Sequence, residues 1–130
     1  MTKIVDALSQ GVSSVRCKHV LANLAASRVR KLFLFADDGL ELTTAAVAAL
    51  CNSMPASLTD VRCQGQFPGV GLCFAQRIHV HSQNFVRLRS MELIGCGLAD
   101  EDGLALGRAL MGNTTLVSID LRTNHIRDAG

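Results

Sequence analysis

Two stretches of the sequence follow one pattern at a fixed distance, and this repeat constrains the fold more than any other feature. Residues 88–98 and 116–126 both read L-x-x-L-x-L-x-x-N/C-x-L, with aliphatic substitutions, at an offset of 28 residues. An acidic stretch that contains glycine follows each of them, at 99–103 and at 127–130. A fixed period of this length is typical of repeat architectures, in which each unit buries its apolar face against the next.

The repeated pattern predicts a strand followed by a helix. Alternate residues of a strand point to opposite sides, so one set enters the core: Met91, Leu93, Ile119 and Leu121. In residues 103–111, Leu106 and Leu110 are four positions apart, which places both on one face of a helix. Each repeat therefore supplies one strand and one helix.

These motifs resemble leucine-rich repeats. The 28-residue period with a full helix is similar to the ribonuclease-inhibitor-like branch, which is also found in NOD-like receptors and Ran GTPase-activating proteins. Segment 103–126 carries the match, including Asn-Thr-Thr-Leu at 113–116. The resemblance implies an α/β fold, a leucine-rich repeat solenoid (horseshoe segment) with parallel strands on the concave face and helices on the convex face. In that family the side chain at the position of Asn124, or Cys96 one repeat earlier, satisfies backbone groups at the turn.

Two weaker copies precede the clear ones. Residues 58–66 keep the frame, with Gln66 in the Asn position, but Pro68 falls where Leu is expected, and a helix should follow at 72–80. Residues 29–37 are the earliest copy, with Asp37 in the Asn position and a helix at about 45–52 after them. The four expected strands are at about 31–35, 60–64, 90–94 and 118–122.

The chain therefore divides into a capping region and repeats. We expect an N-terminal capping-helix region at 1–28, with a helix ending at Ala26, and leucine-rich repeats over 29–130. The repeats span 29–57, 58–87, 88–115 and, in part, 116–130. No polar capping element follows Ile126, which leaves the last apolar layer open. We expect the chain to belong to a longer protein or a larger assembly, and the open end to permit self-association.

Composition narrows the class of protein. Of the 130 residues 48% are hydrophobic and 18% are charged, which excludes a disordered chain. The chain has 18 Leu and 15 Ala but neither Trp nor Tyr, and such small side chains suit a core of thin stacked layers. The apolar run 45–51 is far shorter than a membrane span. A net charge of +2 and the lack of Trp and Tyr argue against nucleic acid. We expect neither a membrane nor a nucleic acid as partner.

The cysteines and the N-terminus indicate a compartment. Five cysteines are scattered along the chain and no secretory signal precedes them, which predicts reduced thiols in the cytoplasm or another reducing compartment. Residues 1–31 hold six basic residues and one acidic residue. A mitochondrial transit segment is therefore the minor alternative.

Several short motifs suggest chemistry, and each has a structural alternative. Gly69-Val70-Gly71 lies between a predicted strand and helix, as a dinucleotide-binding loop would, but Phe74 stands at its third glycine position. Cys63, Cys73, His79 and His81 have no recognised zinc spacing. Acidic residues 100–102 precede the predicted helix, where they complement its dipole. We expect no catalytic residue, no metal site and no cofactor.

The residues that point away from the core form the candidate binding surface. Aligned by repeat they give three columns: Lys31, Asp60, Ser90 and Ser118; Phe33, Arg62, Glu92 and Asp120; and Phe35, Gln64, Ile94 and Arg122. Exposed aromatic and arginine side chains are typical anchors in protein recognition. The alternative is that residues 1–12 cover Phe33 and Phe35.

These expectations define competing functions. The first is a non-catalytic protein–protein interaction module, a leucine-rich repeat scaffold that binds a protein partner on its concave face. One alternative, implied by the resemblance, is a regulator of a small GTPase of the Ran GTPase-activating type. Others are a structural subunit of a large assembly and a nucleotide-binding α/β fragment, which rests on Gly69 and Gly71.

Overall fold

The computed structural model describes residues 2–11, 13–36, 41–78, 87–111 and 116–124. Within these ranges helices and strands alternate after an initial pair of helices. In chain order the elements are α1 Thr2–Ser9, α2 Val15–Ala26, β1 Lys31–Phe35, α3 Thr44–Ser53, β2 Asp60–Gln64, α4 Val70–Ile78, β3 Ser90–Ile94, α5 Asp100–Leu110 and β4 Ser118–Asp120. This is a mixed α/β fold, as the sequence predicts.

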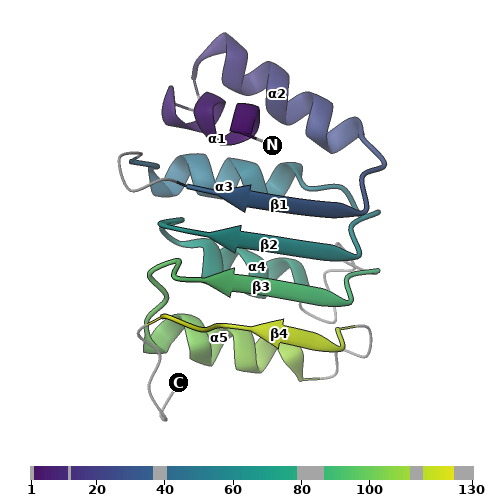
Figure 1. Ribbon diagram of the computed structural model, residues 1–130, viewed down its shortest axis with the longest axis vertical. Coiled ribbons are helices and arrows are strands. Elements are labelled where there is room, and N and C mark those ends of the chain that lie inside the picture. Colours follow the sequence, from purple (N-terminus) through teal and green to yellow (C-terminus); the bar gives the residue numbers. More distant parts are fainter. Residues whose placement is uncertain (1, 12, 37–40, 79–86, 112–115, 125–130) are drawn as a thin grey trace.

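The strands form one parallel sheet whose order follows the chain, β1-β2-β3-β4. Figure 1 shows the strands stacked along the long axis, with α3, α4 and α5 behind them and α1 and α2 beyond β1. The other face of the sheet, in front in this view, carries no helix of the described residues. The sheet therefore has one covered face and one open face.

Backbone hydrogen bonds at the start of the strands repeat from layer to layer. The N–H groups of Thr59 and Asp60 donate to the Arg30 carbonyl, at 2.7 and 3.0 Å. Those of Arg89 and Ser90 donate to the Thr59 carbonyl, at 2.8 and 3.1 Å. Those of Val117 and Ser118 donate to the Arg89 carbonyl, at 2.8 and 3.0 Å. Three successive strands are thus joined to their predecessors in the same way.

Burial alternates along the strands as the L-x-L pattern predicts. The inward side chains of the first three strands are at most 2% exposed: Leu32, Leu34, Val61, Cys63, Met91 and Leu93. Helices α3, α4 and α5 each contribute buried residues to the same core, among them Leu50, Phe74 and Leu106. Since removal of this apolar surface from water is the main favourable contribution to folding, each layer depends on its neighbour.

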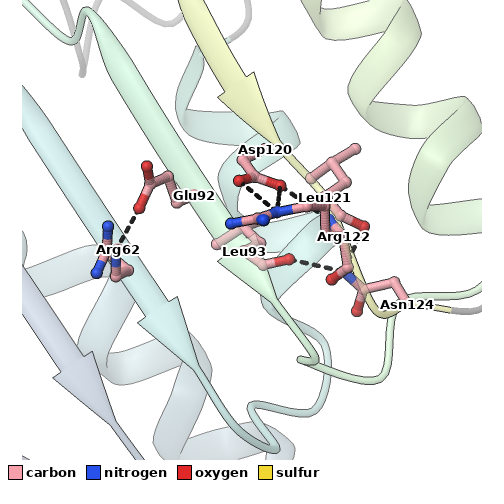
Figure 2. A network of polar contacts seen from close by, with 7 residues as sticks. All are labelled: Arg62, Glu92, Leu93, Asp120, Leu121, Arg122 and Asn124. Atoms are coloured by element: carbon pink, nitrogen blue, oxygen red, sulfur yellow. Dashed lines mark hydrogen bonds and ion pairs between the residues drawn. The ribbon is translucent and has the colours of Figure 1, made fainter.

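The side chain of Asn124 links the turn after β4 to the turn after β3 by hydrogen bonds. Its Oδ1 accepts hydrogen bonds from the N–H groups of Cys96 (2.9 Å) and Leu98 (3.0 Å). Its Nδ2 donates to the carbonyls of Leu93 (2.6 Å) and Leu121 (2.9 Å), as Figure 2 shows. One amide side chain therefore satisfies four backbone groups, which is the role predicted for it.

Cys96 makes a weaker version of the same link one layer earlier. Its Sγ donates to the Cys63 carbonyl at 3.1 Å. A thiol is a poor donor and offers no strong acceptor, so it replaces only part of what Asn124 does. Asp37, predicted to hold this position in the first repeat, lies outside the described residues.

Helix ends follow ordinary capping rules. Ser14 and Thr43 accept hydrogen bonds from the N–H groups of Cys17 and Ala46, both at 3.0 Å, at the starts of α2 and α3. Asp102 accepts one from the Ala99 N–H at 2.9 Å at the start of α5. Side-chain oxygens thus satisfy backbone N–H groups in the first turns of α2, α3 and α5.

The structure corrects several details of the sequence prediction. Ile119 was expected in the core, yet it is 39% exposed, because within the described residues no further layer packs on β4. Strand β4 ends at Asp120 rather than at 122. Helix α4 begins at Val70 and α5 at Asp100, two and three residues before the expected starts. The repeat pattern expects a buried leucine at position 68, where the chain has Pro68. The structure shows that the preceding residue, Phe67, is fully buried in the core instead.

The contrast between inner and outer layers gives a matched prediction. Met91 and Ile119 are register partners on β3 and β4, but Met91 is fully buried. Met91→Ala should lower the free energy of unfolding by about 3 kcal/mol, the typical cost of truncating a buried side chain. Ile119→Ala should cost less than about 1 kcal/mol. Urea denaturation measures both, and equal losses would contradict the layered core.

The Asn124 link gives a second prediction. Asn124→Ala leaves backbone groups of the two turns without partners and should lower the free energy of unfolding by about 2 kcal/mol. Ser118→Ala, at an exposed position of β4, is the control and should change it by less than about 0.5 kcal/mol. If Asn124→Ala unfolds at the same urea concentration as the control, the link contributes nothing.

Candidate functional site

The open face of the sheet is built from the outward residues of the four strands. The register aligns two of the predicted columns completely: Lys31, Asp60, Ser90 and Ser118; and Phe33, Arg62, Glu92 and Asp120. We call this surface, with the third column, the open face.

The third column is aligned as well, although its last member lies beyond a strand. Phe35, Gln64 and Ile94 are register partners, whereas Arg122 follows the end of β4. The backbone nevertheless continues the pattern. The N–H of Ala36 donates to the Gln64 carbonyl (2.9 Å), that of Gly65 to Ile94 (3.2 Å) and that of Gly95 to Arg122 (3.0 Å).

Charges on the open face are paired across and along the strands. Arg62 on β2 forms an ion pair with Glu92 on β3, and Arg122 folds back onto Asp120, with Nε 2.9 Å from Oδ2 (Figure 2). The hydrogen bond to Glu92 raises the pKa of the exposed Arg62 guanidinium. The three columns hold three basic and three acidic residues, so the surface has no net charge.

Aromatic side chains stand beside these ion pairs. Phe33 is 47% and Phe35 57% exposed, so the described part of residues 1–12 does not cover them. The Arg62 guanidinium carbon lies 5.2 Å from the centre of the Phe33 ring, a cation–π distance. Phe33 and Phe35 lie two residues apart on the same side of β1, and contiguous exposed apolar groups mark interaction sites.

A hollow adjoins Phe35 at the carboxyl ends of the strands. It has a volume of about 240 Å³ and is lined by Phe35, Ala36, Gln64, Gly65, Ile94, Gly95 and Thr123. Gly65 has φ +102°, and a Cβ there would lie 2.2 Å from the Ala36 carbonyl oxygen, so only glycine fits. The sequence prediction did not include this hollow. The glycine that follows each of β2 and β3 was the available signal.

Gly71, proposed as part of a nucleotide-binding loop, has a packing role. It lies in the first turn of α4, and a Cβ there would be 2.8 Å from Cβ of Asp102 and 2.9 Å from Cδ2 of Leu98. The glycine thus lets α4 approach the start of α5. This contact accounts for the residue without a ligand.

The other candidate sites are explained structurally or lie outside the described residues. Cys63 is fully buried in the core, and His79 and His81 are not described. Among the described residues no three His, Cys, Asp or Glu side chains gather as metal ligands. The acidic residues 100–102 form the first turn of α5, where Asp102 caps the helix.

No protein-family model, curated protein or solved structure matches the chain. In the described part of the chain, each helix is too short, or too poor in apolar residues, to cross a membrane.

The packing role of Gly71 can be tested against a matched glycine. Gly71→Ala should destabilise the protein by about 2 kcal/mol, because the added methyl overlaps Asp102 and Leu98. Gly107→Ala in α5 meets nothing within 4 Å and should stabilise it by up to about 1 kcal/mol. Thermal unfolding of both variants measures the difference. A neutral Gly71→Ala would show that the helices have room and would reopen the ligand-binding interpretation.

Proposed function

We propose that this protein forms a leucine-rich repeat solenoid that acts as a non-catalytic scaffold and binds a protein on its open face. The observation that carries the proposal is the open face itself. It carries half-exposed Phe33 and Phe35, of which Phe35 lines a hollow, on a sheet whose other face is covered by helices. The layer-to-layer hydrogen bonds and the Asn124 link support the solenoid.

Balanced charge defines the kind of partner. Because three acids offset three bases on the open face, a strongly charged polymer such as nucleic acid would gain little electrostatic energy there. The Phe rings and the hollow instead suit an aliphatic or aromatic side chain of a protein, since buried apolar anchors carry most of the binding energy in such interfaces. The partner we propose is therefore a protein segment that presents an apolar anchor.

The free thiols support a reducing compartment. Four of the five cysteines are buried, and all five are unpaired by disulfides. The cytoplasm is the compartment that we propose on this basis.

A site-specific crosslinking experiment identifies the partner. A photo-crosslinking phenylalanine analogue replaces Gln64 on the open face or, as the control, the exposed Leu72 on α4. We expect a protein that is captured from cell extract through position 64 and not through position 72. Capture of the same proteins from both positions would argue against a site on the open face.

Affinity measurements with that purified protein test the mechanism. Phe35→Ala should weaken binding by about 30-fold, the loss of a typical anchor residue, while Leu72→Ala should leave the Kd unchanged. Exchange of the ion pair, Arg62→Glu with Glu92→Arg, should also weaken binding without unfolding the protein. Equal affinities for wild type and Phe35→Ala would refute the proposed anchor. Calorimetry with ATP and NAD should give no heat of binding.

A further inference from the structure

A groove opens at the end of the molecule that carries α1 and α2. Figure 1 shows α1 between α2 and β1, and α1 packs against both of them. The groove has a volume of about 340 Å³, which is within the range of ligand-binding pockets. Two polar residues and five apolar residues line it, and the apolar ones are Ile4, Val20, Leu24, Val29 and Leu32. No lining residue belongs to the open face, so the groove is a separate surface.

The apolar side chains of the groove are recessed. Leu24 is 6% and Leu32 0% exposed, and Ile4 and Val29 are half-buried against the core. In the described part of α1 and α2, Val15 is the one large apolar side chain that is exposed. Binding to a membrane surface needs apolar side chains that protrude into the lipid. The groove instead requires an occupant that inserts side chains of its own, which suits a protein segment.

Arginine residues adjoin the lining of the groove. Arg16 lies four residues before Val20 and therefore on the same side of α2. Arg28 and Arg30 flank the lining residue Val29 in the chain. All three arginines are exposed, and none of them forms an ion pair with another described residue. Their charges are therefore available to a ligand.

Few acidic residues oppose these charges. Neither the described segment 13–36 nor α3, which packs against α1 and α2, contains Asp or Glu. Asp6 is on α1, but it follows Ile4 by two residues and so points to a different side of that helix. Asp60 is the register partner of Lys31 and lies on the open face. This end of the molecule therefore carries a net positive charge, whereas the charges of the open face are balanced.

We propose that this groove binds an acidic segment of another protein, in which Leu, Ile or Phe side chains stand beside Asp or Glu. The apolar side chains of the segment enter the groove and supply the anchor of the interface. Its carboxylates accept charge-assisted hydrogen bonds from Arg16, Arg28 and Arg30. A nucleic acid would meet the arginines with its phosphates but would leave the apolar lining uncovered. This inference is independent of the function proposed for the open face.

A peptide selection tests the chemistry of the ligand. A displayed library of random peptides is selected on the immobilised full chain and, in parallel, on the double variant Arg16→Glu/Val20→Ser. We expect the peptides that are enriched only on the wild type to combine acidic with apolar residues. The absence of peptides specific to the wild type, or a specific set that is basic or uncharged, would overturn the proposal.

Matched single variants test the two kinds of contact with a selected peptide. Arg16→Glu and Val20→Ser should each weaken its binding by about tenfold. Lys18→Glu makes the same kind of charge change on another side of α2, and Val15→Ser removes the same apolar side chain from an exposed position outside the groove. Both controls should leave the Kd unchanged. Equal losses for Arg16→Glu and Lys18→Glu would show a nonspecific attraction between charges and would overturn the site.

Folding and other occupants are checked with the same variants. Arg16→Glu changes an exposed side chain and should melt at the temperature of the wild type, so that its loss of binding does not come from unfolding. Sedimentation should give the same mass for the wild type and the double variant, and neither should bind vesicles that contain phosphatidylserine. Self-association or vesicle binding that the double variant lacks would assign the groove to a second copy or to a membrane and would overturn the proposal.

Discussion

The structure depends on the pairing of each strand with the one before it. Parallel strands leave their carbonyls and N–H groups to be satisfied by the next strand, and their inward side chains to be covered by the next layer. The Arg30, Thr59 and Arg89 carbonyls each accept two N–H groups from the following layer. The helices, the turns and the open face all take their positions from this sequence of contacts.

The consequences of this constraint differ along the chain. In the inner layers Leu32, Val61 and Met91 are covered on both sides and are almost fully buried. At β4, within the described residues, only one side is covered, and Ile119 remains exposed although it occupies the same position in the repeat. Whether an inward apolar side chain is exposed therefore depends on which strand carries it, not on its residue type.

The sequence therefore predicts the strands and their buried faces well, but it predicts the structure at β4 and at the turns poorly. Alternation of Leu32, Leu34, Met91 and Leu93 fixed the strands and their inward faces, because a period of two admits one assignment. It could not predict that Ile119 is exposed or that β4 ends at Asp120. Both depend on what packs against the side of β4 that faces away from β3. Nor could it show that Phe67 replaces the expected residue at 68, since a shift by one position at a turn is decided by packing.

The open face was predictable in composition but not in its internal contacts. The three columns followed from the repeat frame, and the register agrees with them. The pairing of Arg62 with Glu92 and its stacking on Phe33 require the spatial order of the strands. The hollow beside Phe35 is lined by residues from successive layers, so no single motif of the sequence contains it.

Hydrogen exchange of the backbone amides, measured by NMR under native conditions, tests the layered account most directly. If each strand is held by its neighbours, protection should be greatest in β2 and β3, which are paired on both sides, and clearly lower in β4. Protection in β4 equal to or greater than that in β2 and β3 would contradict the account.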